Sequence, residues 1–237
     1  RKRNFKIRDQ FVDVYHVPCK KTKDFISKHT NKPVEIISYW CNNKLFKKYN
    51  KIKTKKKFNL PLDKIIVGSF QRDTEGQSGM PKLEKGPDIF VNYVKKIAQK
   101  ENKVHVLLNG WRRNYVINKL MESSIPYTYI ELPPMSDVVE MYSAIDLYVV
   151  GSRVEGGPQS IIECVVTETP IVSTDVGIAT NFLPPQCIFD PFDKLKDYTV
   201  YFPTESDVTY SSNLVKDYFI ESHIKNYVEK LTKSNVT

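Results

Sequence analysis

The stretch that decides the fold is residues 151–177, with the sequence GSRVEGGPQSIIECVVTETPIVSTDVG. The apolar run Leu147–Val150 comes directly before it and predicts a buried strand. From Pro158 onward, apolar residues recur at helical spacing, and Pro158 suits the first turn of a helix because its missing N–H would be unpaired there anyway. Residues 170–174 indicate the next strand. The stretch therefore predicts a βαβ unit in which a glycine-containing loop joins the first strand to the helix.

This loop contains Gly156 and Gly157, placed just before the predicted helix. Backbone N–H groups at a helix N-terminus are free and lie at the positive end of the helix dipole, so the position suits an anion. Two carboxylates flank it, Glu155 before the helix and Glu163 inside it, eight positions apart. Glu163 lies among apolar residues, where an acid needs a partner or it costs stability. Spacing alone fits a capped helix with a paired internal acid as well as it fits a ligand site.

The segment EGGPQSIIE, followed by TPIVSTDVG, resembles the retaining glycosyltransferases of family 4, also called group 1, which have the GT-B fold. The hallmark of that family is two glutamates separated by seven residues, then a small residue, a proline, an apolar strand and a glycine. Glu155 and Glu163 have this separation. The resemblance covers about residues 39–190 and is strongest over residues 140–177. It implies transfer of a sugar from a nucleotide-diphosphate sugar to an acceptor hydroxyl.

Strand and helix patterns alternate regularly from Lys64 onward. The predicted strands are residues 65–69, 104–108, 127–132, 147–150, 171–174 and 187–189. The predicted helices are residues 88–100, 111–123, 136–144, 158–167 and 213–233. This alternation predicts an α/β fold, a Rossmann-like parallel sheet with helices on both faces, which the resemblance identifies as the C-terminal half of a GT-B fold. Because ligands bind beyond the carboxyl ends of such strands, the loops at Gly68, Gly110 and Gly151 are expected at the binding end.

The resemblance also divides the chain into four parts. Residues 1–38, with predicted strands at 11–17 and 33–39 and a helix at 20–29, are expected to be the end of an acceptor-side N-terminal domain that is mostly missing. Residues 39–60 are a basic interdomain linker, beginning with YWCNNKLF, which matches in position a family loop that ends in Phe. Residues 61–212 form the nucleotide-sugar-binding domain. Residues 213–237 form a C-terminal helix that packs toward the N-terminal domain.

A second group of charged residues lies in residues 68–86, GSFQRDTEGQSGMPKLEKG. The family places an Arg in this loop and a Lys before a Gly, where both bind the donor diphosphate. The matching residues are Arg72 and Lys85, with Lys82 as a competing choice. Fixed cations there stabilise the charge that develops on the leaving diphosphate. With Glu155, Arg72 and Lys85 form the catalytic set that the resemblance implies.

By the same resemblance, Glu163 accepts hydrogen bonds from the ribose hydroxyls and Glu155 orients the transferred sugar. The backbone between them meets the sugar and the β-phosphate. The implied donor-binding set is Arg72, Lys85, Glu155, Gly156, Gly157, Pro158, Gln159 and Glu163. The donor base (UDP, GDP or ADP), the sugar and the acceptor (glycan, lipid or protein) stay open. No Asp-x-Asp lies in a metal-binding context, so we expect neither a metal nor another cofactor.

The formal net charge is +9, from 36 Lys and Arg against 27 Asp and Glu. Much of it lies in residues 44–57, KLFKKYNKIKTKKK, which could attract an anionic membrane, nucleic acid or a phosphorylated substrate, or could be a solvated linker. No RNA-binding motif with interleaved aromatic and basic residues is present, so nucleic acid is not expected.

No apolar run approaches the roughly 20 residues that span a bilayer. None of the four cysteines has zinc-ligand spacing. We therefore expect a cytoplasmic protein, with peripheral membrane association left open.

Two rival functions remain at this point. A sugar-nucleotide epimerase shares the two-domain arrangement, although Arg72 and Lys85 fit a transferase better. A basic, non-enzymatic binding module for nucleic acid or membrane is permitted by the charge. His105, inside a predicted strand, is expected to be structural. Residues 111–114 (Trp-Arg-Arg-Asn) could touch the nucleotide but fit the start of a helix better.

Overall fold

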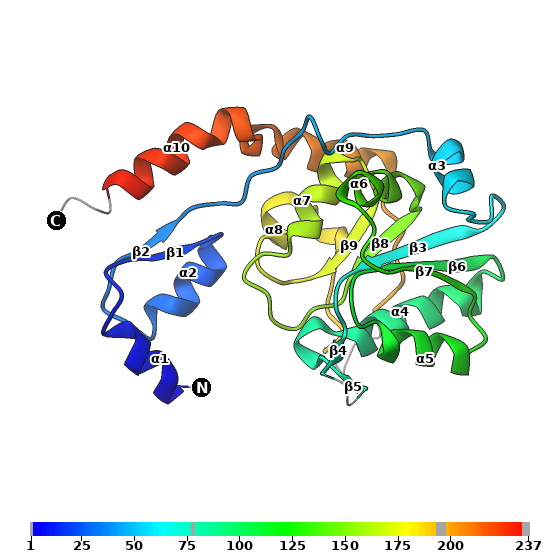
Figure 1. Cartoon of the computed structure of the whole chain (residues 1–237), viewed down its shortest axis with the longest axis horizontal. Coiled ribbons are helices and arrows are strands. Elements are labelled where there is room, and N and C mark those ends of the chain that lie inside the picture. Colours follow the sequence, from blue (N-terminus) through cyan, green and yellow to red (C-terminus); the bar gives the residue numbers. More distant parts are fainter. Residues whose placement is uncertain (1, 77–78, 193–197, 234–237) are drawn as a thin grey trace.

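The structure is a computed structural model that describes residues 2–76, 79–192 and 198–233. Its larger lobe is built on a parallel sheet of six strands in the order β10–β9–β8–β3–β6–β7 (Figure 1). The strands are β3 (Ile65–Phe70), β6 (Val104–Asn109), β7 (Tyr127–Ile130), β8 (Leu147–Val150), β9 (Ile171–Thr174) and β10 (Ile188–Phe189). The predicted parallel α/β sheet is confirmed, and each of the six strands predicted from residue 65 onward is present to within two residues at its ends.

Helices cover both faces of this sheet (Figure 1). They are α4 (Pro87–Lys100), α5 (Asn114–Glu122), α6 (Met135–Ala144), α7 (Gln159–Val166), α8 (Ala179–Phe182) and α9 (Glu205–Leu214). Successive strand residues point to opposite faces, so Ile66 joins the core beneath α6 and α7 while Val67 joins the core beneath α4 and α5. Both faces are therefore buried, which explains why most strand residues are apolar.

Several predicted helix boundaries differ from the structure, and the helix predicted from residue 111 begins at Asn114 as α5. Pro158 precedes α7 as its N-cap residue and lies outside the first turn. The continuous helix expected over residues 213–233 is wrong, because α9 ends at Leu214 and a 3₁₀ turn, η3 (Lys216–Tyr218), separates it from α10 (Ile220–Lys233). The backbone is extended at Phe219, where Cys41 accepts a hydrogen bond from the N–H of Ile220 and donates one to Tyr218. This pairing with a distant segment breaks the helix.

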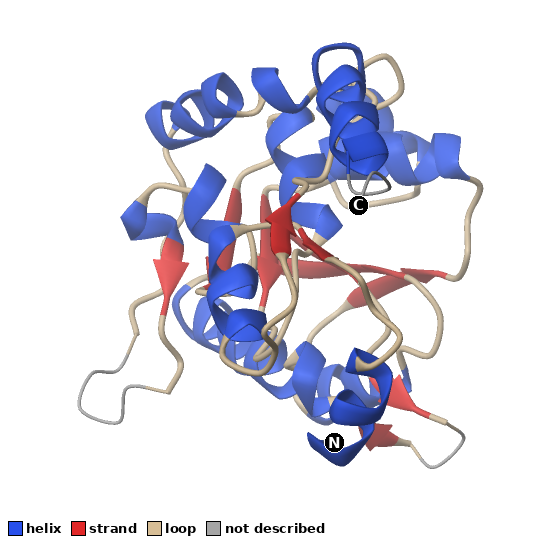
Figure 2. Cartoon of the chain, turned by 90° about the vertical axis from the view of Figure 1, so that its left-hand side faces the viewer, coloured by secondary structure: helices blue, strands red, loops and turns tan. Residues whose placement is uncertain are grey.

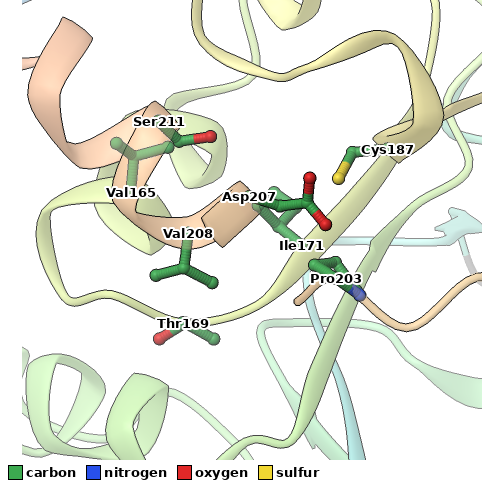
Figure 3. A pocket seen from close by; sticks show the side chains of 8 residues that line it. All are labelled: Val165, Thr169, Ile171, Cys187, Pro203, Asp207, Val208 and Ser211. Carbon is green, nitrogen blue, oxygen red and sulfur yellow. The ribbon is translucent and has the colours of Figure 1, made fainter. Parts of the chain in front are cut away.

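Helix α9 packs against α7 and β9 around a small pocket drawn in Figure 3, lined by Val165, Thr169, Ile171, Cys187, Pro203, Asp207, Val208 and Ser211. Asp207 anchors the contact: it accepts hydrogen bonds from the Tyr201 hydroxyl (2.6 Å), the Gln186 amide (2.5 Å) and the N-cap residue Thr204 (2.8 Å). Burial raises the pKa of Asp207, but these hydrogen bonds outweigh it and lower the pKa to about 2. The Asp207 carboxylate thus holds α9 against the larger lobe.

The smaller lobe consists of α1 (Lys2–Asp9), β1 (Tyr15–Val17), α2 (Lys20–Ser27) and β2 (Val34–Ile36). β1 and β2 pair in parallel and are shorter than the predicted strands, and α1 was not predicted. Figure 2 views the molecule from the side of this lobe. Helix α10 reaches back to it, where the Lys230 ammonium donates to the carbonyl of Ile36 at 2.7 Å. No helix in the described ranges combines the length and the apolar character that crossing a membrane requires.

The basic run differs from a solvated linker. Residues 51–57 form helix α3 (Lys51–Lys57), and most lysines of the run pair with acids of the larger lobe or of α10. Lys51 and the buried Lys55 both bind Asp146, at 2.8 and 2.9 Å. The other pairs are Lys44–Glu221, Lys48–Glu168, Lys57–Asp137 and Lys57–Glu140. Much of the positive charge that suggested an anionic partner is therefore offset within the chain, and the run attaches this segment to the sheet domain.

Candidate functional site

The loops that follow β3 and β8 meet at the carboxyl end of the sheet. Gly86 ends the 3₁₀ turn η1 (Leu83–Lys85) with a left-handed φ of 59°, and a side chain there would overlap the carbonyl oxygen of Gly151. Arg153 reinforces the contact, because its N–H donates to the carbonyl of Glu84 (2.9 Å) and its guanidinium pairs with Asp88 (2.5 Å). Glycine at position 86 thus lets the two loops touch.

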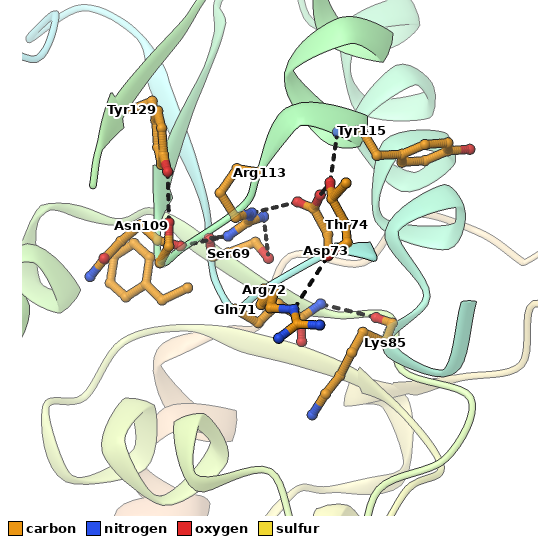
Figure 4. Close-up of polar contacts among 12 residues, drawn as sticks. Ser69, Gln71, Arg72, Asp73, Thr74, Lys85, Asn109, Arg113, Tyr115 and Tyr129 are labelled. Carbon is orange, nitrogen blue, oxygen red and sulfur yellow. Dashed lines mark hydrogen bonds and ion pairs between the residues drawn. The ribbon is translucent and has the colours of Figure 1, made fainter. Parts of the chain in front are cut away.

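This contact brings together two of the predicted site residues. The ammonium of Lys85 forms an ion pair with Oε1 of Glu155, and the Ser152 hydroxyl donates to the same oxygen at 3.3 Å. The Lys85 and Glu155 side chains are 30% and 15% exposed, so the pair is reachable from solvent but is largely covered. The Gln71 amide donates to the Lys85 carbonyl at 2.9 Å and fixes the backbone that carries the lysine (Figure 4).

Arg72 lies on the same loop but turns toward a short hairpin made of β4 (Thr74–Glu75) and β5 (Met80–Pro81). Its Nε donates to the carbonyl of Thr74 at 3.3 Å, and its Nη2 lies 3.5 Å from Oε2 of Glu75. The guanidinium also lies 5.9 Å from the ring centre of Trp111. The structure therefore places Arg72 beside the site and pairs it with Glu75, whereas Lys85 pairs with Glu155.

Lys82, the competing lysine, has different neighbours. Its ammonium lies 3.8 Å from Glu75 and 3.7 Å from Glu84, both within its own loop. Among the pairs that the structure describes, Lys85 is the lysine that reaches the glycine loop. This geometry places Lys85, rather than Lys82, at the glycine loop.

A buried ion pair beneath this loop was missed by sequence reasoning. Arg113 and Asp73 are both fully buried, and the Nε of Arg113 donates to Oδ2 of Asp73 at 2.5 Å. Arg113 also donates to the carbonyls of Ser69 (2.5 Å) and Asn109 (2.7 Å), which lie at the ends of β3 and β6 (Figure 4). Arg113 is also the N-cap residue of α5, so the expected structural role for this segment fits the geometry. Asp73 thereby fixes the chain next to Arg72.

Glu163 has the internal partner that its apolar surroundings require. The hydroxyl of Tyr142, on α6, donates to Oε2 of Glu163 at 2.5 Å. Burial raises the pKa of Glu163, and the hydrogen bond from Tyr142 opposes that rise. No signal in the sequence identified Tyr142, because its helix and α7 are brought together only by the fold.

The glycine loop also contacts the smaller lobe, through Thr22, and the segment that follows that lobe, through Tyr39 and Trp40. A side-chain carbon at Gly157 would lie 2.6 Å from the ring of Tyr39, and one at Gly177, where φ is 50°, would lie 2.7 Å from Gly157. The hydroxyl of Thr22 donates to the carbonyl of Gly156 at 3.0 Å, and the Gln159 amide donates to the carbonyl of Trp40 at 3.4 Å. The predicted segment 156–159 therefore lies between the two lobes, with Pro158 buried and Gln159 exposed.

The Lys85 ammonium, the Glu155 carboxylate and the N-terminus of α7 thus lie at one end of the sheet, whereas Glu163 lies farther along α7 and contacts Tyr142. This set can bind an anion and accept hydrogen bonds from hydroxyl groups. Within the residues described, no group of three or more His, Cys, Asp or Glu side chains could hold a metal ion. His105, expected to be structural, shares a hydrogen bond of 2.8 Å with Thr128, and Cys164 is fully buried.

Residues 77–191, which span the glycine loop and both glutamates, match the family model described as glycosyl transferases group 1. The resemblance to group 1 glycosyltransferases is confirmed. The matched segment is just under half of the chain and contains η1, the glycine loop and α7. No curated protein gives a significant match.

Solved structures of glycosyltransferases share the fold. Sucrose-phosphate synthase from Thermosynechococcus elongatus superposes with a TM-score of 0.70 and 16% identity, over 98% of this chain and 62% of the synthase. HepE from Anabaena, in complex with UDP and glucose, gives a TM-score of 0.76 and 14% identity, over 98% of this chain and 68% of HepE. TarM from S. aureus, in a complex that contains UDP, gives 0.60 and 14%, over 93% and 44%. These likenesses confirm the predicted GT-B fold class, and the chain spans 62% of the synthase's length.

Proposed function

We propose that this chain is the donor-binding part of a retaining glycosyltransferase, which transfers a sugar from a nucleotide-diphosphate donor to an acceptor hydroxyl. The observation that carries the proposal is the ion pair between Lys85 and Glu155 at the N-terminus of α7, with Glu163 farther along the same helix. The group 1 glycosyltransferase match over residues 77–191 supports it.

The donor diphosphate replaces Glu155 as the partner of Lys85. Breaking the bond between the anomeric carbon and the diphosphate oxygen leaves negative charge on that oxygen. The ammonium of Lys85 and the guanidinium of Arg72 stabilise this charge, so no step requires a metal ion. Glu155, released from the lysine, accepts hydrogen bonds from the hydroxyls of the transferred sugar.

The backbone at the start of α7 binds the sugar and the β-phosphate. Gly156, Gly157 and Gln159 have N–H groups to donate, whereas Pro158 has none and instead holds the chain at the φ of −64° from which α7 begins. Glu163 accepts hydrogen bonds from the ribose hydroxyls. The chain therefore contacts the donor at three places: the ribose, the diphosphate and the sugar.

The first donor to test is a UDP-sugar, because the HepE structures contain UDP and UDP-glucose. A glycan is the first acceptor class to test, because the TarM complex contains fondaparinux and an α-GlcNAc-glycerol. UDP-sugars and glycans are therefore tested before other donors and acceptors.

Comparison of two lysines on the same loop tests the proposal. Lys85→Ala removes the proposed diphosphate ligand, whereas Lys82→Ala removes a cation that pairs with Glu75 and Glu84. In calorimetric titrations with UDP and UDP-glucose, Lys85→Ala is expected to weaken binding about tenfold or more, which corresponds to loss of a charged hydrogen bond. Lys82→Ala should change binding little. Equal effects of the two substitutions, or no binding of any nucleotide by the unmodified chain, would refute the proposed site.

A further inference from the structure

We infer that Tyr142 is a positioning residue of the donor site: its phenol holds Oε2 of Glu163 and thereby aims Oε1 at a ribose hydroxyl. Tyr142 would set the preference for ribonucleotides without touching the donor. The inference rests on the proposed function, because it needs Glu163 to bind the ribose.

In this contact the donor, the Tyr142 hydroxyl, is held rigidly, whereas the acceptor, the Glu163 carboxylate, lies on a flexible side chain. The Tyr142 hydroxyl lies 2.5 Å from Oε2 of Glu163, and the tyrosine side chain is 1% exposed. Its ring packs against Phe46, Phe70 and Tyr148, with ring centres 6.3, 5.0 and 5.7 Å away. The backbone of Tyr142 is held as well, because the hydroxyl of Thr169 donates to its carbonyl at 2.9 Å. The phenol therefore cannot swing away from Glu163.

Glu163 depends on this one contact for its orientation. Among the described residues, Tyr142 is the one that donates a hydrogen bond to the carboxylate, through Oε2, and Oε1 receives none. A glutamate side chain has three rotatable bonds and loses much rotamer freedom when it is fixed. With Oε2 occupied by the phenol, Oε1 is the oxygen left for a ribose hydroxyl.

The protonation states suit this arrangement. Burial raises the pKa of the Tyr142 hydroxyl well above its ordinary value, so the phenol stays protonated and remains a donor. Burial also raises the pKa of Glu163, and the hydrogen bond from Tyr142 works in the opposite direction by favouring the ionised carboxylate. A phenol at this position thus both orients the acceptor and favours its charged form.

The position of Tyr142 also connects the ribose acid to the diphosphate loop. Phe70, which packs on Tyr142, is the last residue of β3 and is followed directly by Gln71 and Arg72. One aromatic contact therefore separates the residue that holds Glu163 from the loop that carries Arg72. Loss of the phenol hydroxyl alone leaves this ring packing in place, which makes Tyr142→Phe a selective probe.

A neighbouring tyrosine supplies the matched control. Tyr148, on β8, is also almost fully buried and packs on the same Phe70 ring, but its hydroxyl accepts a hydrogen bond from the N–H of Phe70 at 2.8 Å. Tyr148→Phe therefore removes a buried hydroxyl from the same aromatic cluster without removing a donor to Glu163. A general effect on the core should appear in both variants.

The experiment compares affinities for a nucleoside diphosphate and its 2′,3′-dideoxy analogue by calorimetry, using whichever of UDP, GDP and ADP binds most tightly. Tyr142→Phe is expected to weaken binding of the ribonucleotide about tenfold, the size of a hydrogen bond to a charged group, and binding of the dideoxy analogue less than twofold. Tyr148→Phe should leave the ratio of the two affinities unchanged. In the double variant Tyr142→Phe with Glu163→Ala, the loss should equal that of Glu163→Ala alone, because Tyr142 acts through Glu163.

Three results would overturn the inference. The first is a folded Tyr142→Phe variant whose preference for the ribonucleotide matches that of the unmodified chain, while Glu163→Ala abolishes that preference; the proposed donor site would then stand without a role for Tyr142. The second is unfolding of Tyr142→Phe, by thermal melting, under conditions where Tyr148→Phe stays folded, which would assign the phenol to the core. The third is no discrimination by the unmodified chain between ribose and dideoxyribose, which would remove the proposed role of Glu163 together with the inference.

Discussion

Lys85 and Glu155 form an ion pair between loops that lie 70 positions apart in the sequence, at the place where the segments after β3 and β8 touch. In the chain without a ligand, the charges of Lys85 and Glu155 neutralise each other. A ligand that carries both a diphosphate and hydroxyl groups can satisfy each of them separately, the phosphate at Lys85 and the hydroxyls at Glu155. The pair therefore links the chemistry of the donor to two specific loops of the fold.

The first prediction concerns metal. Because Lys85 and Arg72 supply the positive charge, binding of the nucleotide sugar should be unchanged by EDTA in calorimetric titrations. The loss in Lys85→Ala should be larger for the nucleoside diphosphate than for the nucleoside, which lacks the group that the lysine binds. A strict requirement for Mg²⁺ or Mn²⁺ would contradict this assignment of the two cations.

The second prediction concerns pH. Burial raises the pKa of Glu163, so its carboxylate is protonated at a higher pH than an exposed glutamate. Donor affinity should fall as the pH is lowered through this raised pKa, and Glu163→Gln should abolish that step. The other titratable groups around it are Tyr142, Tyr148, Cys164 and Cys41, whose pKa values burial raises, so they stay protonated throughout the acid range.

The same shift has an opposite consequence for stability. With a pKa that is higher in the folded state than in the unfolded chain, Glu163 binds more protons when folded. Stability should therefore fall as the pH rises from the ordinary glutamate value through the raised pKa. Glu163→Gln should remove this slope in melting experiments performed without nucleotide, and an unchanged slope would show that the carboxylate does not titrate as its burial implies.

The third prediction concerns Asp207, which lies on α9 and is not part of the proposed donor site. Its pKa is about 2 in the folded chain against an ordinary 3.8, so its stabilising effect is present above the ordinary value and is lost as the pH falls toward 2. At pH 7, Asp207→Asn should lower the free energy of unfolding by about 1–2 kcal/mol, since it weakens a cap and several hydrogen bonds. The exposed Asp217→Asn is the control and should change stability by less than about 0.5 kcal/mol. Equal effects at pH 7 would contradict the anchoring role.

The fourth prediction concerns transfer. Transfer needs an acceptor hydroxyl held against the anomeric carbon, and most of the barrier reduction comes from that positioning. The smaller lobe offers two short paired strands, and the chain spans 62% of the synthase's length. These residues alone should therefore bind a sugar nucleotide and transfer sugar poorly, with slow donor hydrolysis as the side reaction. Full transferase activity from these residues, assayed with a nucleotide sugar and a glycan acceptor, would place the acceptor site within this chain.

Local sequence patterns predicted the sheet because mostly apolar strands alternate with helices, several of which have one apolar face. The limits of β8 (Leu147–Val150) and β9 (Ile171–Thr174) were predicted to the residue. The pairs that build the site could not be predicted in this way. Tyr142 meets Glu163 across 21 positions and Arg113 meets Asp73 across 40, and neither separation has a local signature.

Long-range partners also explain the predictions that were wrong. The helix expected over residues 213–233 breaks where Phe219 pairs with Cys41, far away in the chain. The lysines near residue 50 looked like a solvated run because their acidic partners, such as Asp146 and Glu168, lie roughly a hundred positions later. Periodicity describes which face of an element is apolar, but it does not show which other element that face will meet.

The central claim is that Glu163 and Lys85 bind a nucleotide sugar, and the affinity of Glu163→Ala tests it most directly. The measurement is a calorimetric titration of UDP-glucose, UDP, GDP and ADP into the unmodified chain and the variant, with thermal melting of both. We predict binding by the unmodified chain and about a tenfold to hundredfold loss in Glu163→Ala, with the fold intact, because a charged hydrogen-bonding partner is worth about 1.5–3 kcal/mol. Equal affinities of the two proteins, or unfolding of the variant, would contradict it.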